Sequence, residues 1–188
     1  MEVLATAIPE VKLVRPVYHG DERGYFAEVF NRRRFEDAGL PHDFVQDNQS
    51  LSATRGTLRG LHFQTPPFAQ TKLVRVLKGA VLDVAVDLRR GAATYGQHVM
   101  VEISAANRLQ MLVPRGFAHG FLTLEPDTEV LYKVDAYYAP DHDCGVRFDD
   151  PDLAIPWPAD PGVAVISAKD REQPALRDLP MWFDDEVA

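Results

Sequence analysis

Several short stretches of the chain place a hydrophobic residue at every second position. Residues 82–88 alternate leucine and valine with aspartate and alanine, and residues 99–104 follow the same period. In residues 129–134, Tyr132 falls on the same side as the two valines. Because successive side chains of a β-strand point to opposite faces, each stretch predicts a strand with one core face, and Tyr132 is expected to point inward.

Only residues 31–39 show the signals of a helix, with Asn31 as the expected N-cap and Gly39 as the stop. The 14 prolines and 12 glycines separate short runs rich in Val, Leu, Phe and Tyr. The proline-rich segment 151–161 is expected to wrap the rest as irregular chain. Many short strands and few helices predict a mostly β fold, either a sandwich or a barrel, of which a jelly roll is one kind.

Length and composition indicate a single domain over residues 1–188. The 188 residues suffice for one full core and are too few for two ordinary domains. The content of 46% hydrophobic and 26% charged residues excludes a disordered or collagen-like chain. The net charge of −8 argues against nucleic acid or an anionic membrane as a partner. An anionic ligand would therefore require a local basic pocket.

Cysteine usage and the first residues indicate a compartment. Cys144 is the single cysteine, so an internal disulfide is impossible and an oxidising compartment is not required. The start of the chain lacks the basic and apolar regions of a signal peptide, and no apolar run approaches the roughly 18 residues of a membrane helix. A cytoplasmic location is expected.

Polar side chains suited to chemistry are densest between Phe44 and Lys72, where amides, arginines, a histidine and a lysine occur together. Stretches of this kind commonly carry function. The alternative is structural, because Asn48 and its neighbours could satisfy turn backbone and the stem of Arg59 could cover apolar surface. Composition alone leaves both interpretations open.

A second cluster, residues 114–121, has the spacing Pro-x-Gly-x-x-His, which ends at His119 and resembles the second motif of cupin barrels. In metal-binding cupins the first motif supplies two histidines and a glutamate. The corresponding place here holds His62 alone, and no glutamate follows at the matching distance. Two histidines fall short of the three protein ligands of a typical catalytic metal site, so no metal is expected.

Eight motifs along the chain, taken together and in their order, are more specific than any one of them alone. They are DERGYFAEVF (21–30), FVQDNQS (44–50), LRGLHFQ (58–64), AQTKLVRV (69–76), DVAVDLR (83–89), PRGFAHGF (114–121), LYKVDAYYAP (131–140) and SAKD (167–170). Together they resemble the dTDP-4-dehydrorhamnose 3,5-epimerase family. The resemblance implies a cupin-like jelly roll, also called a double-stranded β-helix, and a homodimer. It also implies a dTDP-linked 4-keto-6-deoxy sugar as substrate, on the route to L-rhamnose, with no metal or nucleotide cofactor.

The reaction of this family defines what the site must contain. A proton removed from carbon 3 or 5, beside the carbon 4 ketone, leaves an enolate, so a base, an acid across the ring and a cation near the oxygen are needed. The resemblance assigns the base to His62 and its orienting carboxylate to Asp170, supplied by the segment after about residue 150. It assigns enolate stabilisation to Lys72 and the acid to Tyr132.

The resemblance also implies contacts to the nucleotide sugar, with the ring of Tyr138 stacking on thymine. The matching residues are Arg23, Glu28, Gln46, Asp47, Asn48, Arg59, His119, Tyr138, Asp143 and Lys169. Strict alternation would place Arg59 and His62 on opposite faces of a strand, so either a bulge or a turn is required between them. Asp143 is a departure, because many relatives have the longer glutamate there.

Three other functions remain as alternatives. Enzymes of the same scaffold invert only carbon 3 or only carbon 5 of a related sugar, whereas the presence of His62, Lys72, Tyr132 and Asp170 favours inversion of both. A metal-dependent cupin oxygenase or isomerase would contain a bound metal. A catalytically silent binding module would bind the nucleotide sugar without exchanging its protons.

Overall fold

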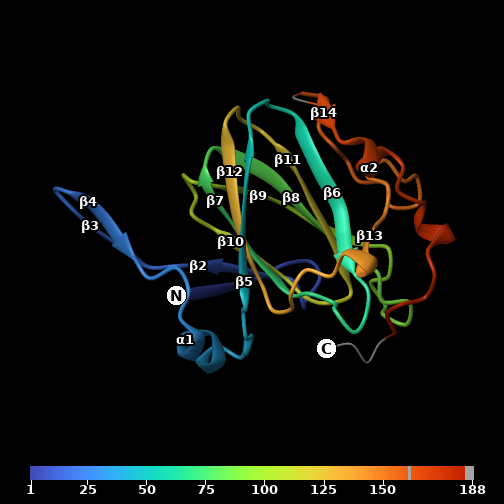
Figure 1. The fold of residues 1–188 in the computed structure, drawn as a ribbon. Coiled ribbons are helices and arrows are strands. Elements are labelled where there is room, and N and C mark those ends of the chain that lie inside the picture. The colour runs from blue at the N-terminus through green and yellow to red at the C-terminus, as the bar shows by residue number, and fades with distance from the viewer. Residues whose placement is uncertain (161, 185–188) are drawn as a thin grey trace.

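The computed structural model describes residues 1–160 and 162–184, and two antiparallel sheets form its centre (Figure 1). The first sheet contains, in spatial order, β1 (Glu2–Ala5), β2 (Lys12–Arg15), β10 (Gln110–Val113), β7 (Lys72–Lys78), β12 (Thr128–Val134) and β5 (Gln46–Ser52). The second contains β13 (Asp143–Gly145), β6 (Thr57–Gln64), β11 (Phe117–Thr123), β8 (Ala80–Asp87) and β9 (His98–Ser104). A short strand, β14 (Val165–Ile166), adds to β6 in parallel.

The three strands expected from alternation are present as β8, β9 and β12. On β12, Val130 and Tyr132 contact the same cluster between the sheets, so the inward direction of Tyr132 is confirmed. The two faces of β8 are both buried, because Ala85 packs between the sheets while Val84 and Val86 pack outward under C-terminal residues. The acidic positions of β8 are therefore interior positions.

The expected helix is α1 (Arg32–Asp37). The side chain of Asn31 accepts a hydrogen bond from the Arg34 amide, and Gly39 follows the helix with a φ of 75°, as expected for a cap and a stop. Before this helix, β3 (Tyr18–Asp21) and β4 (Gly24–Ala27) form a hairpin that projects away from both sheets (Figure 1).

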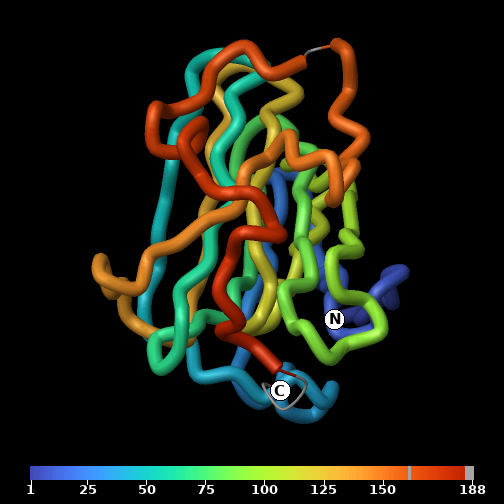
Figure 2. Tube along the Cα trace, turned by 90° about the vertical axis from the view of Figure 1, so that its right-hand side faces the viewer, coloured from blue at the N-terminus to red at the C-terminus, as the bar shows by residue number. Residues whose placement is uncertain are grey.

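The described part of the proline-rich segment 151–161 is irregular, whereas the chain after it contains short elements. Residues 151–160 contain neither helix nor strand, whereas Pro161 lies outside the described residues. Residues 162–184, called the C-terminal strap below, cross the outer face of the second sheet (Figure 2). The strap includes α2 (Ala168–Arg171) and the short 3-10 helix η2 (Leu176–Asp178), and another short 3-10 helix, η1 (Pro140–His142), precedes β13.

Burial of apolar side chains holds the strap in place. Leu176, Leu179 and Phe183 pack on Val84 and Val86 of the second sheet. Removing this apolar surface from water stabilises the strap against the sheet. None of the helices in residues 1–160 and 162–184 is long and apolar enough to cross a membrane.

Candidate active site

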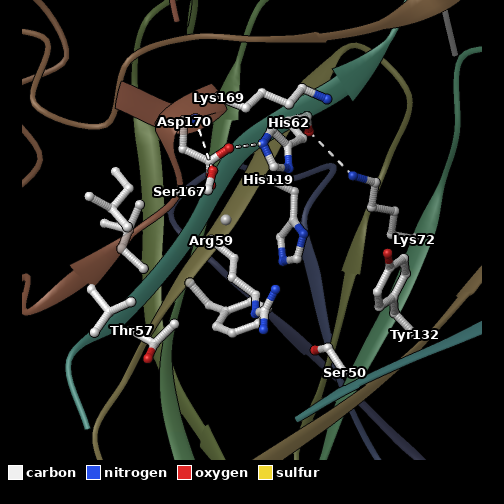
Figure 3. A pocket seen from close by; sticks show the side chains of 15 residues that line it. Ser50, Thr57, Arg59, His62, Lys72, His119, Tyr132, Ser167, Lys169 and Asp170 are labelled. Atoms are coloured by element: carbon white, nitrogen blue, oxygen red, sulfur yellow. Dashed lines mark hydrogen bonds and ion pairs between the residues drawn. The ribbon is translucent and has the colours of Figure 1, made fainter. Parts of the chain in front are cut away.

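A cavity of about 450 Å³ lies between the two sheets, and the strap closes one of its sides (Figure 3). It is lined by all four residues to which the resemblance assigns catalysis, which are His62 on β6, Lys72 on β7, Tyr132 on β12 and Asp170 on α2. A neighbouring cavity of about 240 Å³ shares His62, Lys72 and Tyr132. Residues scattered over more than 100 positions of sequence thus converge on one space.

A bulge in β6 brings Arg59 and His62 into this cavity together. The pairing of β6 with β11 shifts by one residue between these two positions. Gly60 has a φ of 123°, and a Cβ atom built on it would lie 2.6 Å from the Cα atom of Gly120. Only glycine fits such a close approach in this conformation. Either a bulge or a turn could bring Arg59 and His62 to the same face, and the structure has the bulge.

His62 forms a close pair with Asp170. The Nε2 atom of His62 lies 2.7 Å from Oδ1 of Asp170, and the Gly60 amide donates to Oδ2 over 3.2 Å. The imidazole is partly exposed and the carboxylate is buried. Burial alone would raise the pKa of Asp170, but hydrogen bonding and charge from His62 outweigh burial, so this pKa lies below its ordinary value.

Lys72 is buried beside this pair. Its Nζ atom donates to the carbonyl oxygen of His62 over 3.2 Å. Burial lowers the pKa of Lys72 to about 8, although the carboxylates of Asp143 and Asp83 act in the opposite direction. The sequence alone allows a solvated lysine here, and the structure excludes that interpretation.

Tyr132 reaches the cavity from the sheet opposite His62. It lines both cavities while its ring contacts the core between the sheets. Burial raises the pKa of its hydroxyl, and the nearby charge of Asp143 acts in the same direction. The hydroxyl is therefore a protonated donor at neutral pH.

His119 forms a second pair, with Asp83. It lies directly opposite His62 on the neighbouring strand, and its Nε2 atom is 2.7 Å from Oδ1 of Asp83. Asp83 is completely buried, and its Oδ2 atom has no hydrogen-bond partner among the described residues. His119 lines the larger cavity, whereas Asp83 lies behind it.

The smaller cavity contains residues matched to nucleotide binding. Gln46, Asn48, Tyr138 and Asp143 line it. The Tyr138 hydroxyl donates to Oδ2 of Asp143 over 3.0 Å, and Lys169 Nζ donates to the same oxygen over 2.6 Å. The shorter aspartate at position 143 thus connects the ring of Tyr138 to the strap.

Three residues matched to nucleotide binding do not line either cavity of this chain. Arg23 lies on the projecting hairpin, where it pairs with Asp21. Glu28 pairs with Arg34 beside α1. Asp47 points to the outer face of its sheet and pairs with Lys133, because its neighbours on β5 take the inward positions.

Sequence reasoning missed two residues of the site, Ser167 and Asp83. Ser167 lines the cavity, and its hydroxyl accepts a hydrogen bond from the Asp170 amide as the N-cap of α2. The Ser-x-x-Asp spacing in SAKD is a helix-start signal that could have located it. For Asp83, alternation predicts a solvated polar face, and no local signal in the sequence shows that this face is buried.

Metal-binding groups are sparse around the cavity. Within residues 1–160 and 162–184, no three histidine, cysteine or acidic side chains assemble in a way that could hold a metal ion.

Comparison with known proteins identifies the family. The family model described as dTDP-4-dehydrorhamnose 3,5-epimerase matches residues 5–178. The chain belongs to this family. A dTDP-4-dehydrorhamnose 3,5-epimerase of Sinorhizobium fredii is 53% identical over 177 residues, which cover 94% of this chain and 90% of that protein.

Solved structures of the family share the fold. The enzyme of Bacillus anthracis, crystallised with TDP and PPi, has a TM-score of 0.89 and 51% identity, covering 93% of this chain and 98% of that one. A dTDP-6-deoxy-D-glucose-3,5-epimerase of Legionella pneumophila, in complex with dTDP-4-keto-L-rhamnose, has a TM-score of 0.92 and 42% identity, covering 97% of both chains. The expected mostly β, cupin-like jelly roll is confirmed.

Proposed function

We propose that this epimerase inverts carbons 3 and 5 of dTDP-4-dehydro-6-deoxy-D-glucose, giving dTDP-4-dehydro-L-rhamnose. One observation supports the mechanism above all: His62, hydrogen-bonded to Asp170, and Tyr132 reach one cavity from opposite sheets. His62 donates Nε2–H to Asp170, so its Nδ1 atom is the base that takes the proton from the sugar carbon. Asp170 then stabilises the imidazolium that forms.

Charge moves to the carbon 4 oxygen when the proton leaves. Lys72 supplies a positive charge inside the cavity and stabilises the enolate, where one such group typically contributes about 10² to 10³ in rate. Tyr132 then donates its hydroxyl proton to the same carbon from the opposite face, which inverts the centre. Before the second carbon is inverted, the imidazolium of His62 releases its proton to solvent and the Tyr132 phenolate takes one up. Applied in turn at carbons 3 and 5, these steps consume no cofactor, and each inverted carbon carries a new proton.

Nucleotide binding explains the basic groups in an acidic protein. Arg59, His119 and Lys169 bind the diphosphate sugar, because guanidinium and ammonium groups donate to phosphate oxygens. Tyr138 stacks on thymine, held in place through Asp143. This local set of donors and cations overcomes the unfavourable net charge of −8.

The active form is a homodimer in which the projecting hairpin reaches the partner. Arg23 and Glu28 match nucleotide contacts but lie outside the cavities of their own chain. The hairpin also exposes the rings of Tyr25 and Phe26 to solvent. Insertion beside the cavity of a second copy would bury these rings and complete that copy's nucleotide site.

The remaining assignments follow from the same chemistry. Residues 1–188 act as one domain, because the strap completes a site built on both sheets. The partner is a small soluble nucleotide sugar in the cytoplasm, and neither nucleic acid nor membrane takes part.

Because side chains perform every step, exhaustive chelation of metals should leave turnover unchanged. Recovery of lost activity by one particular divalent ion would contradict the mechanism.

Exchange of sugar protons in heavy water tests the proposed function. Incubated with the dTDP-4-keto-6-deoxy sugar, the protein should introduce deuterium at carbons 3 and 5 and form the L-rhamno product, as followed by NMR. His62→Ala should bind the nucleotide sugar without exchange. Exchange at a single carbon would identify a monofunctional epimerase, and binding without exchange by the unaltered protein would identify a silent binding module.

A further inference from the structure

The C-terminal strap carries Asp170 to the site from outside the sheets, so its attachment decides where this carboxylate lies. Upstream of Asp170, the strap is fixed by the pairing of β14 with β6. The amides of Ala164 and Val165 also donate to the carbonyl oxygen of Gly56. These bonds fix the chain a few residues before α2.

Downstream of Asp170, the strap is fixed a second time. The Leu176 amide donates to Oδ2 of Asp150 over 2.7 Å, and the Arg147 amide donates to the carbonyl oxygen of Pro174 over 2.9 Å. Asp170 therefore sits in a short span held at both ends. Pro174 lies inside this span and restricts its φ, so the span has little freedom to absorb a shift at Leu176.

Asp150 anchors the strap through its buried carboxylate. It is only 2% exposed, and each of its carboxylate oxygens accepts one backbone amide, from Asp152 and from Leu176. No cationic side chain of the described residues lies within ion-pair distance of it, and the nearby guanidinium of Arg147 is paired with Asp149 and interacts with Asp150 only through its charge. Burial of an unpaired charge is costly and requires such hydrogen bonds. The two amides approach different carboxylate oxygens, so asparagine would place its NH2 group, which is a donor, opposite one of them.

We infer that Asp150 is a positioning residue of the active site, which holds the strap at Leu176 so that Asp170 meets His62. This inference rests on the proposed function for its kinetic consequences. The hydrogen bonds from His62 and Gly60 to Asp170 require the carboxylate to lie within a narrow region. Misplacement of a catalytic group by about 1 Å can cost about 10² in rate.

A double-mutant cycle with Asp170 separates positioning from general support of the fold. Asp150→Ala should lower kcat by about 10- to 100-fold and change KM much less, because Arg59 and His119 keep their contacts to the nucleotide sugar and only Lys169 moves with the strap. In the Asp170→Asn background the same change should lower kcat no further, because the group being positioned has already lost its function. Multiplication of the two losses would overturn the inference.

Asn107→Ala is the matched control. The Asn107 side-chain oxygen also accepts two backbone amides, from Ser104 and Leu109, but in the turn between β9 and β10. It should lower Tm without lowering kcat. Should Asn107→Ala lower kcat as much as Asp150→Ala, the effect of Asp150 is one of general stability and the inference is wrong.

The proton on Nε2 of His62 gives a readout that needs no activity. Its NMR signal should lie far downfield in the unaltered protein, vanish in Asp170→Asn, and shift upfield or broaden in Asp150→Ala. An unchanged signal in Asp150→Ala would overturn the inference even if the protein proved not to be an epimerase. Where Asp150→Ala fails to fold, Asp150→Asn keeps one acceptor and should show the same changes to a smaller degree.

Discussion

Two histidine–aspartate pairs lie side by side in this protein and share the same contact distance. His62 and His119 face each other on neighbouring strands, and each places Nε2 2.7 Å from an aspartate oxygen. The first pair joins residues 108 positions apart, because Asp170 arrives on the strap, whereas Asp83 lies within the same sheet as His119. Distance alone therefore does not identify the base.

The surroundings of the two pairs differ in ways that matter for proton transfer. The His62 side chain is 32% exposed, against 7% for His119. Oδ2 of Asp170 accepts the Gly60 amide, while the corresponding oxygen of Asp83 has no partner in the described part of the chain. An accessible imidazole can receive a proton from a ligand, whereas a mostly buried imidazole is better suited to hold a fixed contact with it. We expect His62 to change protonation state during turnover and His119 to keep its own.

Replacing each histidine by alanine should give the largest contrast. His62→Ala should lower kcat by about 10² to 10⁴, the usual contribution of general base catalysis, with little change in KM. His119→Ala should mainly raise KM, because a binding contact is lost. Steady-state kinetics of both variants measure this difference. Equal losses of kcat would mean that both histidines act on protons and would remove the distinction between the two pairs.

The position of Tyr132 opposite His62 gives the next contrast. Tyr132→Phe keeps the ring but removes the proton donor, so inverted product should fall by about 10² or more. His62 can still remove a proton and return a solvent proton to the same face, so deuterium should enter the recovered substrate. NMR in heavy water compares the two rates. Product formation at the parental rate would make Tyr132 a packing residue, and parallel loss of exchange and product would assign it to positioning.

The two aspartates should separate rate from stability. Asp170→Asn should lower kcat by roughly 10² with a small change in Tm, because the imidazolium of His62 loses its carboxylate. Asp83→Asn should lower stability by about 1 to 3 kcal/mol, because a buried charge-assisted hydrogen bond is weakened, with a smaller effect on kcat. Thermal unfolding and steady-state kinetics on the same samples measure the two effects, on stability and on kcat. A reversed ranking would place the working base at His119.

Part of this arrangement could be predicted from local pattern. Two-residue alternation located β12 and the inward face of Tyr132, and cap signals located α1. The roles of His62, Lys72 and Asp170 came from family motifs, because a lone histidine, lysine or aspartate carries no local signal of its function. Whether these residues would meet in one cavity could not be read from either source.

The features that pattern could not predict depend on contacts between distant segments. The bulge in β6 exists because Gly60 and Gly120 approach across two strands, which neither sequence neighbourhood reveals. Alternation predicts that Asp83 lies on a solvated face, but this face, shared with Ala85, points between the two sheets, while the strap covers the opposite face with Val84 and Val86. Arg23 and Glu28 carry motif signals yet lie away from the cavities of their own chain.

The pH dependence of Lys72 offers the smallest effect and the sharpest test of what the cavity does to a charge. With a pKa of about 8, Lys72 is protonated at neutral pH and loses its charge as the pH rises through that value. The enolate then loses its cation, so kcat/KM, which reports the free enzyme, should fall by about tenfold per pH unit above 8. Lys72→Arg stays charged at these pH values and should lack this decline. The free energy of unfolding should change in the opposite direction. The unfolded chain keeps the Lys72 proton up to the ordinary pKa of 10.5, whereas the folded chain releases it near 8. The unfolding free energy should therefore rise with pH between about 8 and 10.5, relative to Lys72→Met. A decline that persists in Lys72→Arg would assign the titration to another group.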